Sequence, residues 1–329
     1  MNGISVIICC YNSAKRINQT LSFLVAQEVI SQFTWEIIIV DNASNDNTGK
    51  VIEEFIDNHA NISFQLKYEP IPGLINARRL GIGSAKYELI VFCDDDNHLD
   101  SHYLENAFQI MSTMSLVAIA GGWCKPKLPF DPGKWIESNF TALAIEKESK
   151  APGFVDWVFG AGMVIRKQIF QELEGREIKI ILTGRIGNKQ TSGEDAELCV
   201  LVRFLGYKVC YSPDLVLHHN ISANRLTKWN FIKANYKNVF MVVYFFLLNN
   251  LIDDIAVQSR DLFKLFMQSR LKYTLYYFPR IFIGRNSFFS FMMFYQNVQL
   301  LFWTFLRKEL FMKTYQRIKE NLYTPHGRK

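Results

Sequence analysis

Short hydrophobic runs alternate with helix-like segments along the N-terminal part of the chain. Each run is almost continuously apolar, which is typical of strands buried on both faces of a parallel sheet. The predicted strands cover residues 4–10, 35–40, 62–68 and 87–93, and the predicted helices cover residues 13–26, 48–57 and 74–84. The pattern therefore predicts an α/β fold with a mostly parallel sheet flanked by helices.

The alternation becomes less regular after Gly121. Residues 125–153 contain four prolines and read as a long excursion, and residues 178–192 read as a polar loop. Between and after these segments we expect a turn, a strand and a short helix over 159–170, a helix over 193–205 and a strand over 207–218. The chain from Arg225 onward reads as helical throughout. We therefore expect two domains, an α/β domain over residues 1–228 and a helical extension over residues 229–329.

Composition limits the class of protein. Of 329 residues, 49% are hydrophobic and 21% are charged, which is enough to build a packed core and excludes disorder as the dominant state. The six cysteines form no CxxC pair, which argues against a disulfide scaffold or a zinc cluster and favours a reducing compartment.

Charge is distributed unevenly. Residues 225–329 hold 17 Lys and Arg against 5 Asp and Glu, and they hold 25 of the 47 aromatic residues. The aromatic residues lie among Leu, Ile, Met and Val in helical runs, which favours an anionic lipid surface over nucleic acid as the partner. The alternative is a helical cap that completes the fold, with or without a dimer face; the sequence does not predict an oligomeric state.

Two stretches of this basic region are apolar enough to be compared with membrane spans. Residues 239–248 are too short for a bilayer, which needs ~20 residues. Residues 288–306 are long enough but are interrupted by Gln296, Asn297 and Gln299. We expect both to be buried or interfacial helices. Because the chain opens without a basic leader segment, we expect a cytoplasmic protein that binds the inner face of the membrane peripherally.

Three consecutive carboxylates follow the fourth predicted strand. Asp94 and Asp96 point the same way in an extended segment, so both can address one ligand. Paired hard oxygens suit Mg²⁺ or Mn²⁺ shared with phosphate oxygens. The alternative interpretation is a solvated acidic loop.

Three further patterns have candidate chemistry. Glu194 and Asp195 open a predicted helix, where carboxylates either complement the helix dipole or act as a general base. His219 follows a predicted strand and could be a metal ligand, a pyrophosphate contact or a structural residue, and His218 is a weaker candidate. Gly160 and Gly162 would allow close backbone approach to a ligand, or mark a tight strand entrance.

Taken together and in this order, these segments resemble family 2 glycosyltransferases of the GT-A fold. The matching segments are SVIICCYN (5–12), VDNASND (40–46), GLINARR (73–79), DDD (94–96), WVFGAG followed by Arg166 (157–166), GEDAEL (193–198) and HNISANRLT (219–227). Two departures stand out. Cys9 and Cys10 replace the usual Pro-Thr, and Arg79 replaces the usual Asn.

The resemblance implies an inverting transfer of a sugar from a nucleotide sugar, with a UDP-sugar favoured, to a hydroxyl of a saccharide or lipid-linked acceptor in cell-surface polysaccharide assembly. It implies Asp195 as the catalytic base and a Mg²⁺ or Mn²⁺ cofactor. The implied nucleotide-binding residues are Tyr11, Asn12, Asp41, Arg78, Asp94 and Asp95. The implied metal ligands are Asp94, Asp96 and His219, and the implied acceptor-side residues are Trp157, Gly160, Gly162 and Glu194.

Two other functions remain open from the residues. A sugar nucleotidyltransferase would also use a nucleotide-binding sheet and metal carboxylates, but it would need a Gly-rich basic loop after the first strand, where this chain has YNSA. The second is an inactive, membrane-bound binding module. Release of free nucleoside diphosphate from sugar nucleotides distinguishes both from a glycosyltransferase.

Overall fold

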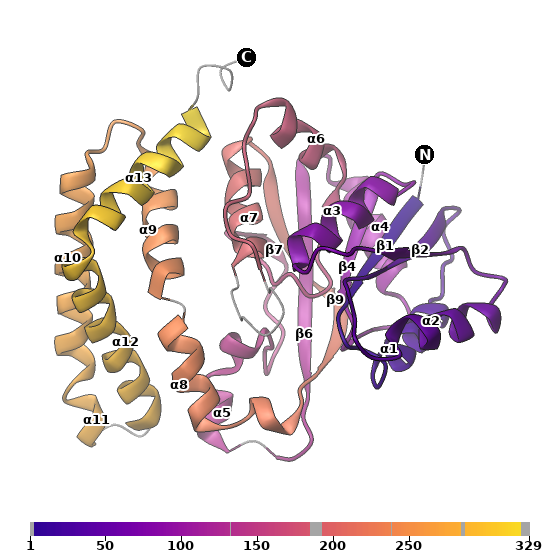
Figure 1. The fold of residues 1–329 in the computed structure, drawn as a ribbon, viewed down its shortest axis with the longest axis horizontal. Coiled ribbons are helices and arrows are strands. Elements are labelled where there is room, and N and C mark those ends of the chain that lie inside the picture. The colour runs from indigo at the N-terminus through magenta and orange to yellow at the C-terminus, as the bar shows by residue number, and fades with distance from the viewer. Residues whose placement is uncertain (1–2, 132, 185–192, 238, 284–286, 324–329) are drawn as a thin grey trace. The chain divides into compact units, whose positions relative to one another are not determined.

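The computed structural model describes residues 3–131, 133–184, 193–237, 239–283 and 287–323. The chain forms two compact units (Figure 1). Unit 1 comprises Met1–Leu128, Leu143–Glu172 and Ile180–Ile221, and unit 2 comprises Pro129–Ala142, Leu173–Lys179 and Ser222–Lys329.

Unit 2 therefore includes two segments that the sequence places in the first domain. Trp135 explains the first, because its ring packs edge-on against Phe231 at 5.6 Å and Phe288 at 5.3 Å. Lys179 explains the second, because its backbone exchanges two hydrogen bonds of 3.0 and 2.9 Å with the side-chain amide of Asn321. Such long-range contacts leave no periodic signal in the sequence.

Unit 1 is built on a nine-stranded sheet with the order β3-β2-β1-β4-β8-β6-β9-β5, and β7 pairs with β9. The pairs β1–β2, β2–β3, β1–β4 and β6–β9 are parallel, and the other four are antiparallel. The α/β class is confirmed, with parallel pairing in the N-terminal half and mixed pairing beyond it. The strands are β1 (Gly3–Cys10), β2 (Thr34–Asp41), β3 (Phe64–Tyr68), β4 (Leu89–Asp94), β5 (Asn97–Leu99), β6 (Val117–Lys127), β7 (Gly153–Val155), β8 (Val164–Arg166) and β9 (Lys208–Asn220).

The apolar runs form strands because their Ile and Val side chains are buried on both faces of the sheet. The side chains of residues 37–40 in β2 and of residues 89–92 in β4 are all buried. Helices supply the cover, with α3 against β1 and β2, and α4 and α7 against β6 and β9. The helices that begin in this unit are α1 (Ile17–Val25), α2 (Thr48–Asp57), α3 (Leu74–Ser84), α4 (Tyr103–Thr113), α6 (Gln168–Gly175) and α7 (Glu194–Phe204).

Strand β6 continues through the point where the hydrophobic pattern breaks. It reaches Lys127, so the irregular segment that the sequence predicts from Lys125 begins three residues later, at residue 128. Gly122 is the reason that the pattern misleads, since a Cβ there would lie only 1.9 Å from the Leu215 carbonyl oxygen. The close approach of β9 at a register shift requires glycine where a strand normally has a larger residue.

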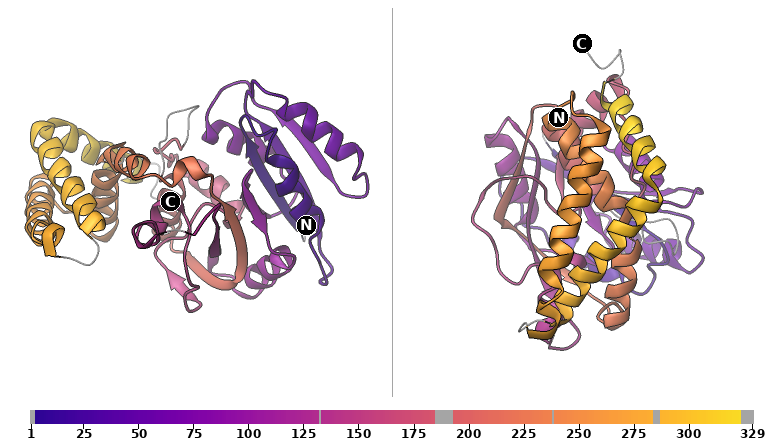
Figure 2. Two further views of the ribbon diagram at one scale, coloured as in Figure 1. Left: turned by 90° about the horizontal axis from the view of Figure 1, so that it is seen from below. Right: turned by 90° about the vertical axis from the view of Figure 1, so that its left-hand side faces the viewer.

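Unit 2 is helical, as predicted for the chain after Arg225. Helices α10 and α12 lie side by side, and α11 connects to the end of α10 at one end of this pair (Figures 1 and 2). Its core includes Phe266, which contacts Phe246 at 4.9 Å and Phe311 at 6.0 Å. The elements are α5 (Lys134–Glu137), η1 (Phe140–Leu143), η2 (Ala223–Arg225), α8 (Lys228–Lys237), α9 (Val239–Asp253), α10 (Ser259–Tyr277), α11 (Arg280–Ile283), α12 (Ser287–Leu306) and α13 (Lys308–Tyr323).

Among the described residues, no helix combines the length and apolar composition required to cross a bilayer. Helix α12 is long enough, but a polar stripe of Ser290, Asn297 and Thr304 is buried within it. Asn297 Oδ1 accepts a hydrogen bond of 3.3 Å from Arg270 Nη1. Asn297, one of the three polar residues noted in the sequence, thus faces α10.

Candidate active site

Two acidic residues lie at the carboxyl ends of neighbouring parallel strands. Asp41 ends β2 and is opposite Cys10 of β1, and Asp94 ends β4 and is opposite Cys9. This register places both carboxylates at the same edge of the sheet, where open α/β sheets bind their ligands.

Cys9 and Cys10 are the residues of β1 that pair with these two acids. Burial raises the pKa of the Cys9 thiol to about 12, although the nearby Arg78 opposes the shift. Burial also raises the pKa of Cys10. Both side chains are therefore neutral thiols at physiological pH and act as small apolar groups.

A turn brings His219 next to Asp96, although 122 positions separate them in the sequence. Asn97 in β5 is opposite His219 in β9, and the Asn220 N–H donates to the Asp96 carbonyl at 3.0 Å. His219 Nε2 consequently lies 3.5 Å from Asp96 Oδ1, and His219 is only 4% exposed. His218 is on the opposite face of β9, where burial lowers its pKa.

Asp96 and His219 fit a divalent cation that takes few protein ligands. In the described part of the chain, no group of three or more His, Cys, Asp or Glu side chains is arranged to hold a metal alone. One carboxylate oxygen and one imidazole nitrogen can still hold Mn²⁺ or Mg²⁺ when phosphate oxygens and water complete the coordination.

Asp95, the middle acid, has a different environment. Its carboxylate accepts hydrogen bonds from Ser13 Oγ and from Arg16 Nη2, the latter at 2.6 Å. Thr20 Oγ1 donates to its carbonyl oxygen at 2.9 Å. Burial raises the pKa of Asp95, and the Arg16 and Ser13 hydrogen bonds oppose that shift. Asp95 thus anchors the acidic turn to the segment that follows β1.

Arg78 of α3 connects the sheet edge to α7. Its Nη1 lies 3.5 Å from Glu194 Oε1, and its guanidinium lies over the Phe92 ring at 4.7 Å. Burial alone would lower the pKa of Arg78, but the carboxylates of Glu194, Asp94 and Asp195 raise it above its ordinary value. The Arg78 cation, whose side chain is 12% exposed, is therefore close to acids from two distant parts of the chain.

Glu194 is the buried partner of Arg78. Burial raises the pKa of Glu194, an effect that Arg78 opposes and Asp195 reinforces. Within the described residues its second oxygen, Oε2, is buried and has no hydrogen-bond partner. Such an oxygen is a candidate contact for a ligand hydroxyl.

Asp195 is held by two backbone amides. Its Oδ2 accepts the Gly160 N–H at 2.8 Å, and its Oδ1 accepts the Ala196 N–H at 2.8 Å. A Cβ on Gly160 would lie 3.0 Å from the Asp195 Cβ and 3.1 Å from Oδ2. Glycine at position 160 therefore permits the close approach that fixes the orientation of the Asp195 carboxylate.

Gly162 has a packing role. Its φ is +72°, and a Cβ there would lie 2.4 Å from Leu217 Cδ2 and 2.5 Å from the Tyr103 hydroxyl. Its carbonyl accepts a hydrogen bond from Tyr103. Trp157 is 44% exposed and packs edge-on against Phe159 at 5.2 Å, which leaves part of its ring available to a ligand.

Asn12 joins the loops that follow β1 and β2. Its N–H donates to Ser44 Oγ at 3.0 Å, and its Oδ1 accepts the Asn45 N–H at 2.8 Å. Its φ of 51° is in the left-handed region that Asn tolerates. The preceding residue, Tyr11, donates its N–H to Ser13 Oγ at 3.2 Å. These bonds hold Asp41's loop beside the end of β1.

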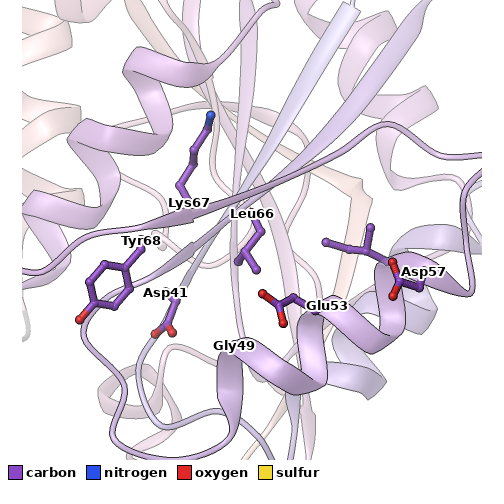
Figure 3. A pocket seen from close by; sticks show the side chains of 8 residues that line it. Asp41, Gly49, Glu53, Asp57, Leu66, Lys67 and Tyr68 are labelled. Carbon is purple, nitrogen blue, oxygen red and sulfur yellow. The ribbon is translucent and has the colours of Figure 1, made fainter.

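A cavity of 540 Å³ lies beside Asp41. Asp41 Oδ1 accepts the Ser44 N–H at 3.1 Å, and a Cβ on Gly49 would lie 3.5 Å from Asp41 Oδ2. Figure 3 shows Asp41 from β2, Tyr68 from β3 and Glu53 from α2 around this cavity. Of the residues predicted to bind the nucleotide, Asp41 lines this cavity, whereas Tyr11, Asn12, Arg78, Asp94 and Asp95 are not among its lining residues.

Asn42 is a positioning residue that sequence reasoning did not assign. Its Nδ2 donates to the carbonyls of Glu69 at 3.1 Å and Ile71 at 2.8 Å, and its Oδ1 accepts the Gly73 N–H at 2.7 Å. Asn42 thereby fixes the start of α3, which carries Arg78. The only indication of this role in the sequence is the position of Asn42 directly after Asp41 at the end of a predicted strand.

Comparison with known proteins identifies the family. The model of Glycosyl transferase family 2 matches residues 5–173. The poly-beta-1,6-N-acetyl-D-glucosamine synthase of Staphylococcus epidermidis is 36% identical over 100 residues, which cover 30% of this chain and 23% of the synthase. The chondroitin synthase of Escherichia coli is 27% identical over 121 residues, covering 37% of this chain and 17% of that enzyme. The chain thus matches less than a quarter of the length of these two relatives.

Solved structures share the fold. The mannosyltransferase PcManGT from Pyrobaculum calidifontis, in complex with GDP-Man and Mn²⁺, has a TM-score of 0.56 at 15% identity, covering 98% of this chain and 81% of that one. TarS 1–349 from S. aureus, in complex with UDP-GlcNAc, has a TM-score of 0.54 at 14% identity, covering 94% of this chain and 92% of that one. At these identities the likeness concerns the fold alone, which is that of GT-A glycosyltransferases.

Proposed function

Because the chain belongs to glycosyltransferase family 2, we propose that it transfers a sugar from a nucleotide sugar to a hydroxyl group with inversion at the anomeric carbon. One observation carries the proposal. Arg78 lies within electrostatic reach of Asp94 at the sheet edge and of Glu194 and Asp195 at the start of α7. The Arg78 guanidinium is therefore near both a residue that would bind the donor and the residue that would deprotonate the acceptor.

Asp41 is our candidate for recognition of the nucleobase. Asp41 Oδ1 accepts the Ser44 N–H, and its carboxylate can still accept a hydrogen bond from a base N–H. The uracil N–H is such a donor, and we propose a UDP-sugar as the donor. Tyr11 and Asn12 would line this site, and Arg78 would contact the diphosphate.

Asp96 and His219 would hold Mn²⁺ or Mg²⁺, with Asp94 as a further candidate ligand. The imidazole nitrogen favours Mn²⁺, because Mg²⁺ prefers oxygen ligands. When bound, the metal neutralises charge that develops on the departing diphosphate. Asp95 would contribute by fixing the turn that carries these ligands.

Asp195 would act as the general base. The acceptor hydroxyl gives its proton to the Asp195 carboxylate. The oxygen of that hydroxyl then bonds to the anomeric carbon from the face opposite the nucleotide. The bond from that carbon to the phosphate oxygen breaks with its electron pair, and the nucleoside diphosphate leaves. Each Asp195 oxygen that accepts a backbone N–H retains a lone pair for the proton. Positioned base catalysis contributes roughly 10²–10⁴-fold.

The acceptor would be a saccharide or a lipid-linked saccharide of the cell surface. Trp157 and the buried Oε2 of Glu194 are the side chains that we propose to contact it, near Gly160 and Gly162. The names of the relatives, which include two polysaccharide synthases, support this acceptor class. The net charge of residues 225–329 supports peripheral binding to the anionic inner face of the membrane.

The test is release of nucleoside diphosphate from a panel of UDP- and GDP-sugars with Mn²⁺ and saccharide acceptors. We expect acceptor-dependent release of UDP. Release of inorganic pyrophosphate would indicate a nucleotidyltransferase instead. Thermal stabilisation by UDP-sugars with no turnover would indicate a binding module. A ligand at a hundredfold excess over its Kd stabilises the folded protein by ~2.7 kcal/mol.

A further inference from the structure

Large apolar side chains are concentrated at the end of α10 and in α11. Leu275, Tyr276, Phe278, Phe282 and Ile283 are each between 50% and 83% exposed. Figure 1 shows α11, which begins at Arg280, at one end of the helices of unit 2. We call residues 271–283 the α11 tip.

The exposed side chains of the α11 tip form a connected surface. The rings of Phe278 and Phe282 meet edge to face at 5.8 Å, and the Arg280 guanidinium lies 3.5 Å from the centre of the Tyr276 ring. Arg280 Nη1 also donates to the Tyr276 carbonyl at 2.7 Å. A contiguous apolar surface of this kind marks an interaction site in a folded protein.

The electrostatic character of the surrounding chain identifies the partner. Residues 262–308 contain seven Lys and Arg and no Asp or Glu. In the α11 tip, Lys272 is exposed beside Leu271, and Arg280 stacks on an aromatic ring. Aromatic and aliphatic side chains with interspersed cations match the interface of an anionic bilayer. Two tips facing each other would instead juxtapose like charges.

We propose that the α11 tip is the part of the chain that inserts into the interface of an anionic lipid bilayer. This inference rests on the membrane association proposed above and specifies its location. The apolar side chains of α11 enter the acyl boundary, while Arg280 and Lys272 extend to the lipid phosphates. The tip lies in the interface, consistent with the absence of a membrane-spanning helix among the described residues.

The test is co-flotation of the full chain with phosphatidylcholine vesicles that contain or lack 30% phosphatidylglycerol. The double variant Phe282→Ser/Ile283→Ser removes the most exposed apolar groups, and Arg280→Gln removes one charge. Ile30→Ser is the matched control, because Ile30 is 79% exposed and belongs to unit 1. Thermal melting checks that each variant is folded.

We expect the wild type and Ile30→Ser to float with anionic vesicles and less with neutral ones. The double variant should lose about tenfold or more in partitioning, and Arg280→Gln about fivefold on anionic vesicles only. Equal flotation of the double variant and the wild type would overturn the inference while leaving membrane association intact. A wild type that ignores vesicles, or that dimerises through the tip, would overturn both. Release of nucleoside diphosphate in the presence of a soluble acceptor tests the proposed transfer independently of the membrane.

Discussion

Gly160→Ala is the substitution that probes the geometry of the proposed base most finely. The added Cβ would lie 3.0 Å from the Asp195 Cβ and 3.1 Å from its Oδ2. Contacts this short force a neighbour to move by a few tenths of an ångström. Because the Asp195 Cβ is fixed to the backbone, the segments that carry residues 160 and 195 must move apart, which lengthens the hydrogen bond of 2.8 Å from the Gly160 N–H to Asp195 Oδ2.

The magnitude follows from that hydrogen bond. A hydrogen bond to a charged group contributes roughly 1.5–3 kcal/mol. Because the bond lengthens and is not removed, we expect a partial loss of about 0.7–1.4 kcal/mol in transition-state stabilisation, which is about 3- to 10-fold in kcat. Donor binding should change little, since Asp41 accepts a hydrogen bond from Ser44 and Arg78 pairs with Glu194, and neither interaction involves Gly160.

The assay measures kcat for nucleoside diphosphate release together with Kd for UDP in the presence of Mn²⁺. Gly83→Ala is the matched control, because no atom lies within 4 Å of the added Cβ, and a helical alanine stabilises by up to about 1 kcal/mol. An unchanged kcat in folded Gly160→Ala protein would refute the reasoning. An equal loss in UDP affinity would also refute it, because the damage would then extend beyond Asp195.

Two further predictions concern metal dependence and pH. Asp96→Ala should abolish the dependence of residual activity on Mn²⁺, and a wild-type metal titration curve in that variant would remove Asp96 from the ligand set. Burial and Lys127 lower the pKa of His98 to about 4, below its usual 6.5, so folding favours the neutral ring and stability should fall as pH drops from 6.5 towards 4. His98→Phe keeps a ring that can stack on Phe23. Between pH 7 and pH 5 its free energy of unfolding, measured with urea, should fall by about 1–2 kcal/mol less than that of the wild type. An equal fall in both proteins would contradict the assignment.

The parallel half of the sheet could be predicted from sequence largely because β1, β2 and β4 are buried on both faces. The runs around Ile38 and Val91 are apolar without interruption, and helix α3 has the predicted bounds of residues 74–84. Strand β6 was harder to delimit, since Gly122 meets a tertiary requirement, the approach of Leu215, that leaves no local pattern.

The candidate site shows the same division. The position of Asp41 and Asp94 at strand ends follows from the order of apolar runs and polar turns. The pairing of Asp96 with His219 depends on the antiparallel contact between β5 and β9, which no local pattern reveals. The hydrogen bonds of Asp95 to Ser13 and Arg16 likewise depend on how the loop after β1 packs.

The most direct test of the proposed transfer is Asp195→Asn, which preserves the size of the side chain and removes its basicity. Turnover and UDP binding in the presence of Mn²⁺ are measured on the same preparation. The proposed role predicts a loss of about 10²–10⁴-fold in turnover, with a Kd for UDP within about twofold of the wild type. Full turnover in the folded variant would contradict it.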